Sequence, residues 1–188
     1  MLSCICNGGD DMPSLNEEMK TIDYIYSLPD GERAELIDGI IYDMAPPRDE
    51  HQRISSNLIA DIINYIRKNR GDCSAFHSPF AVFLNNDEYN YVEPDIAVIC
   101  DKNKLDDKGC HGAPDFIIEI VSPSSVKMDY MIKMFKYQRA GVREYWIVDP
   151  DKQMVRTYNF IENETADYPF TASIPVGIYP GLELKITQ

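Results

Sequence analysis

Two carboxylates interrupt apolar runs of this sequence, and their positions predict a metal site. Asp95 stands at the head of the run 96–99, and Glu119 lies inside the run 116–121. A carboxylate in the core of a strand costs several kcal/mol in desolvation unless a cation or hydrogen-bond donors compensate it. If the two runs form neighbouring strands, both side chains can converge on one hard cation such as Mg²⁺ or Mn²⁺, with the Ile120 carbonyl as a further ligand.

A structural reading competes with this one. A single carboxylate in a strand belongs more often to an ion pair than to a metal site, and Asp95 alone would indicate no more than that. The combination is more informative, because Glu119 lies in the next strand and the helix predicted after it carries several lysines. Together these residues favour a site for chemistry over a structural ion pair.

The strands that would carry these carboxylates follow from short β-branched runs bounded by turn residues. Asp38-Gly39 stands between two strand-like runs, at 32–37 and 40–44, which predicts a β-hairpin. Further strands are expected at residues 73–84 (broken by Pro79), 91–100, 115–121, 144–148 and 154–160, with one or two more in the C-terminal tail, the last near 182–186.

Apolar residues at three-to-four spacing predict a long amphipathic helix over residues 49–70. A short helix is expected at 21–28, and another should open at the Ser-Pro-Ser-Ser segment 122–125 and end at Ala140, before Gly141. These elements predict an α/β or α+β fold, in which helices flank a mixed β-sheet, with an N-terminal β-hairpin. We expect one domain over residues 21–188 after a flexible tail at residues 1–20, in which Met12 is an alternative start.

Composition excludes several classes of protein. With 44% hydrophobic and 26% charged residues, the 188-residue chain resembles soluble globular proteins rather than disordered or fibrous ones. It has no apolar run long enough to span a membrane and no basic, apolar leader at its start. Five cysteines without a paired or zinc-like spacing favour a reducing cytoplasm, with Cys73, Cys100 and Cys110 as buried or idle thiols.

The net charge of −13 argues against a polyanionic partner, because nonspecific affinity for nucleic acid comes largely from lysine and arginine. The charge is unevenly distributed. Residues 1–50 hold twelve acidic and three basic residues, whereas residues 127–143 hold five basic residues and one acidic residue. One face could therefore be basic on an acidic body.

Several motifs, in the same order, resemble those of the Uma-type putative restriction endonuclease family, whose members have the PD-(D/E)XK motif. The resemblance runs from about Thr21 to the end of the chain. The motifs are Glu35-Leu36-Ile37-Asp38-Gly39, His51-Gln52, Glu93-Pro94-Asp95, Glu119-Ile120-Val121-Ser122-Pro123-Ser124, the segment 139–144 and Tyr145-Trp146-Ile147-Val148-Asp149-Pro150.

The resemblance implies a restriction-endonuclease-like core and a magnesium-dependent endonuclease that hydrolyses DNA phosphodiester bonds. Asp95 and Glu119 would hold the metal. The lysine expected two residues after Glu119 is replaced by Val121, and Lys133 in the following helix looks like its substitute, with Lys136 as the second candidate. Glu35 matches an additional acidic residue of such sites, although it could simply pair with Arg33 or another cation. His51 matches a family histidine whose role the sequence does not reveal.

Two readings of function remain open at this point. The intact set Glu35, Asp95, Glu119 and Lys133 favours a nuclease with a nucleic acid, DNA in the first instance, as its substrate. The charge of −13 favours a catalytically silent nuclease fold that serves as an oligomeric binding or regulatory module. The sheet edge of the hairpin and the C-terminal strands would also suit a homodimer, as cutting both strands of a duplex often requires.

Overall fold

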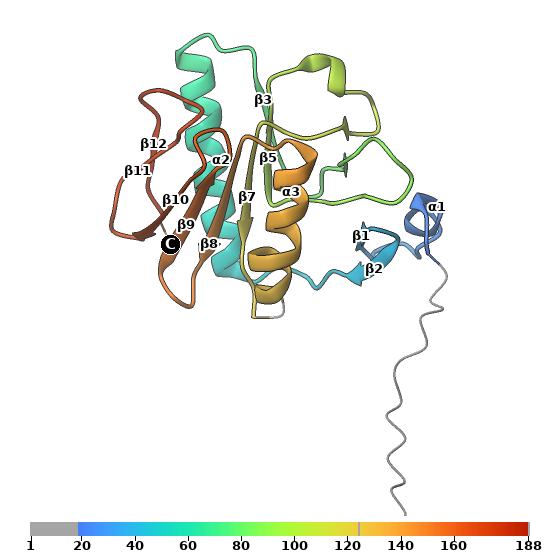
Figure 1. Ribbon diagram of the computed structural model, residues 1–188. Coiled ribbons are helices and arrows are strands. Elements are labelled where there is room, and N and C mark those ends of the chain that lie inside the picture. Colours follow the sequence, from blue (N-terminus) through green and yellow to red (C-terminus); the bar gives the residue numbers. More distant parts are fainter. Residues whose placement is uncertain (1–18, 124, 188) are drawn as a thin grey trace, which may run out of the picture.

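A six-stranded mixed sheet forms the centre of the computed structural model, which describes residues 19–123 and 125–187 (Figure 1). The expected tail at 1–20 and the alternative start at Met12 fall almost wholly outside these residues. The strand order is β10-β9-β8-β7-β5-β3. The strands are β3 (Ser74–His77), β5 (Ile96–Ile99), β7 (Phe116–Ile120), β8 (Glu144–Asp149), β9 (Met154–Asn159) and β10 (Glu164–Pro169). The mixed sheet confirms the predicted fold class.

Within this sheet only β7 and β8 are parallel, and the other neighbouring strands are antiparallel. A parallel pair needs a crossover connection, which the helical segment between the two strands supplies. That segment begins as a π-helix at Met128–Lys133 and continues as α3 (Met134–Ala140). Gly141 ends it with a φ of 96°, in the left-handed conformation that favours glycine.

The helices cover opposite faces of the sheet (Figure 1). On one face, α2 (Asp49–Lys68) buries its apolar stripe, Ile54, Leu58, Ile59, Ile62 and Ile66, against alternate residues of β5 and β7. On the other face, the crossover helix packs on the remaining residues of these strands. Because neighbouring residues of a strand point to opposite faces, both sides of β5 and β7 are buried, which explains their continuous apolar sequences.

The N-terminal hairpin lies beside this sheet. It pairs β1 (Ala34–Ile37) with β2 (Ile40–Asp43), and both residues of its turn, Asp38 and Gly39, have positive φ, at 51° and 77°. This is the turn that the Asp-Gly pair predicted. The short helix α1 (Ile22–Tyr26) precedes the hairpin.

Several predicted boundaries differ from the structure. The expected strand 73–84 is split, because only β3 joins the main sheet, while β4 (Val82–Phe83) pairs in parallel with β6 (Cys110–His111). The expected strand 91–100 pairs in the main sheet only over β5. The C-terminal region contributes three strands rather than one or two, since β11 (Ile174–Pro175) and β12 (Glu183–Leu184) pair with each other after β10. A 3₁₀-helix at Lys102–Lys104 completes the described elements.

The prediction for two of the cysteines was wrong. Cys73 and Cys100 form a disulfide, whereas Cys110 is a buried free thiol as expected. Ser74 pairs with Ile99 in the sheet, so Cys73 and Cys100 occupy the next position of the same antiparallel ladder, where two side chains face each other directly. Over the described residues, no helix is both long and apolar enough to cross a membrane.

Candidate active site

Asp95 and Glu119 face each other across two neighbouring strands. Ile96 pairs with Ile118 in the antiparallel ladder between β5 and β7, so the next pair brings the two carboxylates to the same face at the end of β5. Glu119 Oε2 lies 3.4 Å from the Asp95 backbone nitrogen, and Asp95 Oδ2 accepts a hydrogen bond of 2.7 Å from the Ile120 backbone N–H. The expected adjacency of the two strands is therefore confirmed.

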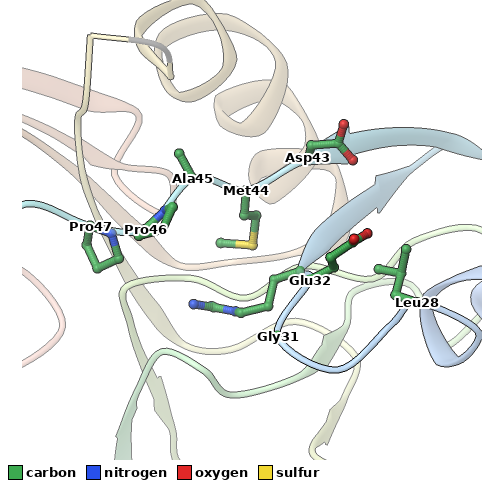
Figure 2. Close-up of a pocket in the computed structure, with 9 residues that line it drawn as sticks. Leu28, Gly31, Glu32, Asp43, Met44, Ala45, Pro46 and Pro47 are labelled. Atoms are coloured by element: carbon green, nitrogen blue, oxygen red, sulfur yellow. The ribbon is translucent and has the colours of Figure 1, made fainter.

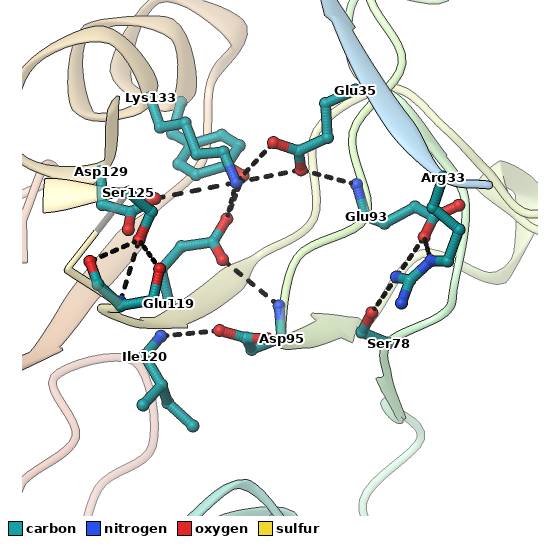
Figure 3. A network of polar contacts seen from close by, with 12 residues as sticks. Arg33, Glu35, Ser78, Glu93, Asp95, Glu119, Ile120, Ser125, Asp129 and Lys133 are labelled. Atoms are coloured by element: carbon teal, nitrogen blue, oxygen red, sulfur yellow. Dashed lines mark hydrogen bonds and ion pairs between the residues drawn. The ribbon is translucent and has the colours of Figure 1, made fainter. Parts of the chain in front are cut away.

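Lys133 reaches this pair from the crossover helix (Figure 3). Its Nζ lies 2.7 Å from Glu35 Oε2 and donates to Glu119 Oε1 at 3.0 Å, and only 6% of the side chain is exposed. Lys136, the second candidate, instead pairs with Asp38 of the hairpin turn. Of the two lysines, it is Lys133 that contacts the carboxylates.

Val121 belongs to the core that packs under the crossover helix. The position that the motif usually gives to lysine therefore serves packing here. Lys133 lies in the π-helix that follows β7, so the ammonium group that contacts Glu119 comes from the helix and not from the strand. A cation is thus present near both carboxylates although the strand itself does not supply one.

Glu35 is positioned by the hairpin and by the chain before β5. Its Oε1 accepts a hydrogen bond of 3.0 Å from the Glu93 backbone N–H. Arg33, the alternative partner considered from the sequence, pairs with Glu93 through its Nε at 2.8 Å and donates to Ser78 Oγ at 2.6 Å. Glu35 is therefore a partner of Lys133, and Arg33 is held elsewhere.

Two further residues of this cluster were missed by the sequence analysis. The Tyr137 hydroxyl donates a hydrogen bond of 2.6 Å to Glu119 Oε1, and Asp129 Oδ1 lies 3.7 Å from Lys133 Nζ. Both are buried. Asp129, Lys133 and Tyr137 follow one another at intervals of four residues, so they share one face of a helix. That spacing could have shown that both residues lie beside Lys133, but not that Tyr137 contacts Glu119.

Burial controls the charge of this cluster. It raises the pKa of Glu119 to about 8, against the opposing effect of the Lys133 charge, and raises the pKa of Asp129 to about 6. Burial alone would lower the pKa of Lys133, but the surrounding carboxylates outweigh it and hold the pKa above its ordinary value. Lys133 is therefore a permanent cation at neutral pH, while Glu119 retains its proton most of the time in the metal-free protein.

The carboxylates open onto a cleft of about 810 Å³, whose lining includes Arg48, His51, Asp95, Ser125 and Lys133. A second pocket of about 440 Å³ adjoins it and is lined by Leu28 and residues 31–33, which precede β1, and by residues 43–47 (Figure 2). Arg33 lines both pockets. The cleft is large enough to admit part of a polymeric substrate to the Asp95 side of the cluster.

His51, in the first turn of α2, stands on the cleft side of Asp95. Its Nε2 lies 3.1 Å from Asp95 Oδ2. Burial lowers the pKa of His51, but the hydrogen bond to Asp95 and the Asp95 charge more than offset this, so the pKa lies above its ordinary value. His51 thus interacts directly with one of the two predicted metal ligands.

The donor set is compatible with a divalent metal, with one restriction. Asp95, Glu119 and the Ile120 carbonyl are the hard oxygen donors that Mg²⁺ and Mn²⁺ prefer. Burial raises the pKa of Glu119, and a cation that replaced the proton would stabilise the ionised carboxylate. Among the described residues, however, no three or more His, Cys, Asp or Glu side chains are grouped closely enough to hold a metal by themselves. Main-chain oxygen and water would have to complete the coordination.

Comparisons with known proteins agree with this geometry. The family model Uma2, described as putative restriction endonuclease, matches residues 19–187. A crystal structure of a putative nuclease belonging to DUF820, from Anabaena variabilis, superimposes with a TM-score of 0.70 and 26% identity, covering 88% of this chain and 94% of that one. Uncharacterized protein slr1290 from Synechocystis is 27% identical over 138 residues, which are 73% of this chain and 70% of that protein.

Proposed function

The chain belongs to the Uma2 family of putative restriction endonucleases, and from this premise we propose that it is a metal-dependent endonuclease that hydrolyses phosphodiester bonds of DNA. Asp95, Glu119 and the Ile120 carbonyl would hold Mg²⁺ or Mn²⁺. Lys133 would act on the attacking water, and Glu35 would orient Lys133.

The contact between Lys133 and Glu119 is the observation that carries this proposal. Val121 occupies the position where the motif has its lysine, and it can neither donate a hydrogen bond nor carry charge. Lys133 Nζ nevertheless lies 3.0 Å from Glu119 Oε1, although fourteen residues separate the two in sequence. Burial of an ammonium group at this point costs desolvation free energy, whereas a lysine at the surface keeps its hydration. Its presence supports a requirement for positive charge beside the carboxylates.

Each residue has a defined task in the proposed reaction. A divalent cation bound here would stabilise charge on the scissile phosphate and lower the pKa of a bound water. Lys133, which remains charged at neutral pH, would orient that water and offset the negative charge of the transition state. Glu35 Oε2 lies 2.7 Å and Glu119 Oε1 lies 3.0 Å from Lys133 Nζ, so two carboxylates would hold the ammonium group in place.

Three further features belong to this proposal. DNA rather than RNA, action as a homodimer and a cytoplasmic location are inferred from the expected chemistry and composition. The Cys73–Cys100 disulfide speaks against the last of these, because disulfides are rare in a reducing cytoplasm.

A catalytically silent binding module is the second candidate. The net charge of −13 favours it, since a nuclease must approach a polyanion. Metal-dependent cleavage that requires Asp95 distinguishes the two candidates most directly.

Plasmid cleavage by the purified protein in Mg²⁺ or Mn²⁺ tests the proposal. Asp95→Asn should abolish cleavage while the metal-free melting temperature changes little. Asp115→Asn is the matched control, because Asp115 also immediately precedes a central strand and its side chain is 14% exposed against 17% for Asp95. Full activity of the Asp95 variant, or no cleavage by the wild type with either metal, would favour the silent module.

A further inference from the structure

The pocket beside the cleft has no task in the proposed reaction. Two chain segments form its walls, one with Leu28 and residues 31–33 and the other with residues 43–47 (Figure 2). Arg33 and residues 43–47 also line the cleft, so the two spaces share a wall. The volume of about 440 Å³ lies in the range of sites for small ligands. A polymer with one phosphate in the cleft could therefore place a neighbouring group in this pocket.

The charges of the pocket disfavour a phosphate as that group. Glu32 and Asp43 line the pocket and are exposed. Arg33 is the only basic residue among the described residues that line it, and its charge is compensated by Glu93, which accepts a hydrogen bond of 2.8 Å from Nε. A phosphate would thus meet two carboxylates without an uncompensated cation. A neutral group that carries hydrogen-bond donors would instead be favoured.

The rest of the lining is apolar. It consists of Leu28, Met44, Ala45, Pro46 and Pro47, of which Leu28 and Met44 are half-buried. A neutral ring with polar edges suits such a lining, because its faces can contact apolar side chains while its edges reach the carboxylates. In DNA this description fits the nucleobase, whereas the phosphate is charged.

Arg33 is held in place with part of its donor capacity unused. Its Nη2 donates to Ser78 Oγ at 2.6 Å and also to Glu93, whereas its Nη1 donates to no described residue. The side chain is 33% exposed. An arginine that is already fixed in this way loses little conformational entropy when it binds a ligand. Arg33 can therefore offer the pocket a hydrogen-bond donor beside the two acceptor carboxylates.

We propose that this pocket binds an unpaired guanine of the DNA, next to the phosphate that is cleaved. The inference rests on the proposed function, because it assumes a DNA strand in the cleft. Guanine has two adjacent acceptors, O6 and N7, on one edge and two adjacent donors, on N1 and N2, on another, and no other base of DNA combines two such edges. Arg33 donates to the acceptors, and Glu32 or Asp43 accepts from the donors.

The pairing state of the guanine follows from these contacts. In a duplex the donors on N1 and N2 are bonded to cytosine, so only an unpaired guanine can offer them to a carboxylate. A single strand presents the base freely, whereas a duplex must first lose a base pair. A strand that is held partly through a base also needs fewer phosphate contacts, in keeping with the net charge of −13.

Fluorescence anisotropy of labelled single strands is the first test. The strands are short oligothymidines with guanine, adenine or cytosine at one central position, and the protein is full-length Asp95→Asn, which should not cut them. The guanine strand should bind at least about tenfold more tightly than the other two, and more tightly than the same strand paired in a duplex. Equal affinity for the three strands, or tighter binding of the duplex, would overturn the proposal.

Variants of the pocket carboxylates test the assignment of the site. In the Asp95→Asn protein, the added pair Glu32→Gln and Asp43→Asn should lose the preference for guanine and bind the adenine strand at least as well as before. Both residues are exposed, so the buried core is not changed. Asp30→Asn is the matched control, because Asp30 is an exposed carboxylate of the same segment that does not line the pocket. A guanine preference that survives the paired change, or that Asp30→Asn removes, would contradict the proposal.

Cleavage of the same strands and of plasmid by the wild type in Mn²⁺ separates this inference from the proposed function. A guanine preference in binding without any cleavage would support the pocket and refute the nuclease. Cleavage of plasmid together with equal or absent binding of the three strands would retain the nuclease and refute the pocket. If both proposals hold, the product lengths should place the cut at a fixed distance from the guanine.

Discussion

Lys133 forms ion pairs with three carboxylates of the candidate site. It lies between Glu35 and Glu119, with Asp129 one helical turn away, and all four side chains are buried. Removing one member of a buried ionic cluster leaves the others uncompensated, which usually costs several kcal/mol. Here the cost is reduced because Glu119, whose pKa is about 8, can hold a proton when its cation is lost.

The first prediction distinguishes the two candidate lysines. Lys133→Met should reduce plasmid cleavage by about a hundredfold or more, because the group acting on the water is lost. Metal binding measured by calorimetry should persist or strengthen, since the carboxylates lose a competing cation. Lys136→Met should cleave like the wild type, because Lys136 pairs with Asp38 at the hairpin turn. The opposite pattern of cleavage would transfer the catalytic role to Lys136.

The second prediction concerns Asp129. Burial raises its pKa from 3.8 to about 6, so the folded protein keeps this proton over a range in which the unfolded chain has released it. The stabilisation is complete below pH 3.8 and is lost as the pH rises to about 6, by roughly 1.4 kcal/mol per unit. The variant Asp129→Asn has no titrating group at this position, so its free energy of unfolding should not fall in this way.

Urea unfolding of the metal-free proteins between pH 4 and 8 measures the effect. The free energy of unfolding of Asp129→Asn should gain on that of the wild type as the pH rises to 6, and the difference should then remain constant. Parallel curves over the whole range would mean that Asp129 does not keep its proton in the folded state.

At this scale the sequence predicted the carboxylates better than their surroundings. Asp95 and Glu119 were identified because a charge inside an apolar strand is conspicuous. Tyr137 was not, because an aromatic residue on a helix is usually part of the core, and its hydroxyl reveals its role only once Glu119 is seen to lie beside it. Lys133 was found only through the family resemblance, since the relation between a lysine and a carboxylate fourteen residues earlier depends on tertiary structure.

The crossover helix shows what local pattern predicts about an element. The sequence indicated one helix ending at Ala140, and the end was correct because Gly141 marks it. The π-helical turn at Met128–Lys133 was not foreseen, because no residue type specifies it. Such turns occur often at functional sites, where they change the direction of side chains relative to an α-helix. Here the turn contains Lys133 itself.

The third prediction concerns the disulfide that joins the ends of β3 and β5. The bond closes a loop of 27 residues, which the loop-entropy relation values at roughly 3 to 4 kcal/mol. Reduction of the wild type should therefore lower its melting temperature and its free energy of unfolding. Cys73→Ser should already be destabilised by a similar amount in oxidising buffer, and a reductant should not affect it further. Identical melting curves for the two proteins without reductant would contradict this stabilisation.

At the scale of the whole molecule, the expected basic face is largely neutralised. Of the five basic residues in the stretch 127–143, Lys133 is buried, Lys136 pairs with Asp38 and Arg143 pairs with Asp115 at 3.2 Å. Lys127 and Arg139 remain exposed, and neither forms an ion pair with a described residue. The count along the sequence was correct, but it could not show which charges are compensated in space.

The single domain at 21–188 also remains a prediction.

The fourth prediction follows from these few exposed cations. Arg48 lines the cleft, and Lys127 and Arg139 are exposed positive charges on the segment between β7 and β8. Neutralisation of about three phosphates gives a slope of about −3 for the logarithm of DNA affinity against the logarithm of salt concentration. A homodimer that engages one duplex with both copies would roughly double this slope. Fluorescence anisotropy of labelled duplex with Asp95→Asn, which should bind without cutting, measures it.

The salt slope also bears on the silent-module alternative. A slope near zero would mean that no phosphates are contacted, which would favour a non-catalytic module on an acidic body. A slope near −3 from a protein that light scattering shows to be monomeric would agree with a nuclease whose affinity comes from the metal and from few basic residues. A slope near −6 that appears only at protein concentrations where a dimer forms would supply the evidence for a homodimer, because the second set of cations must then come from a second copy of the chain.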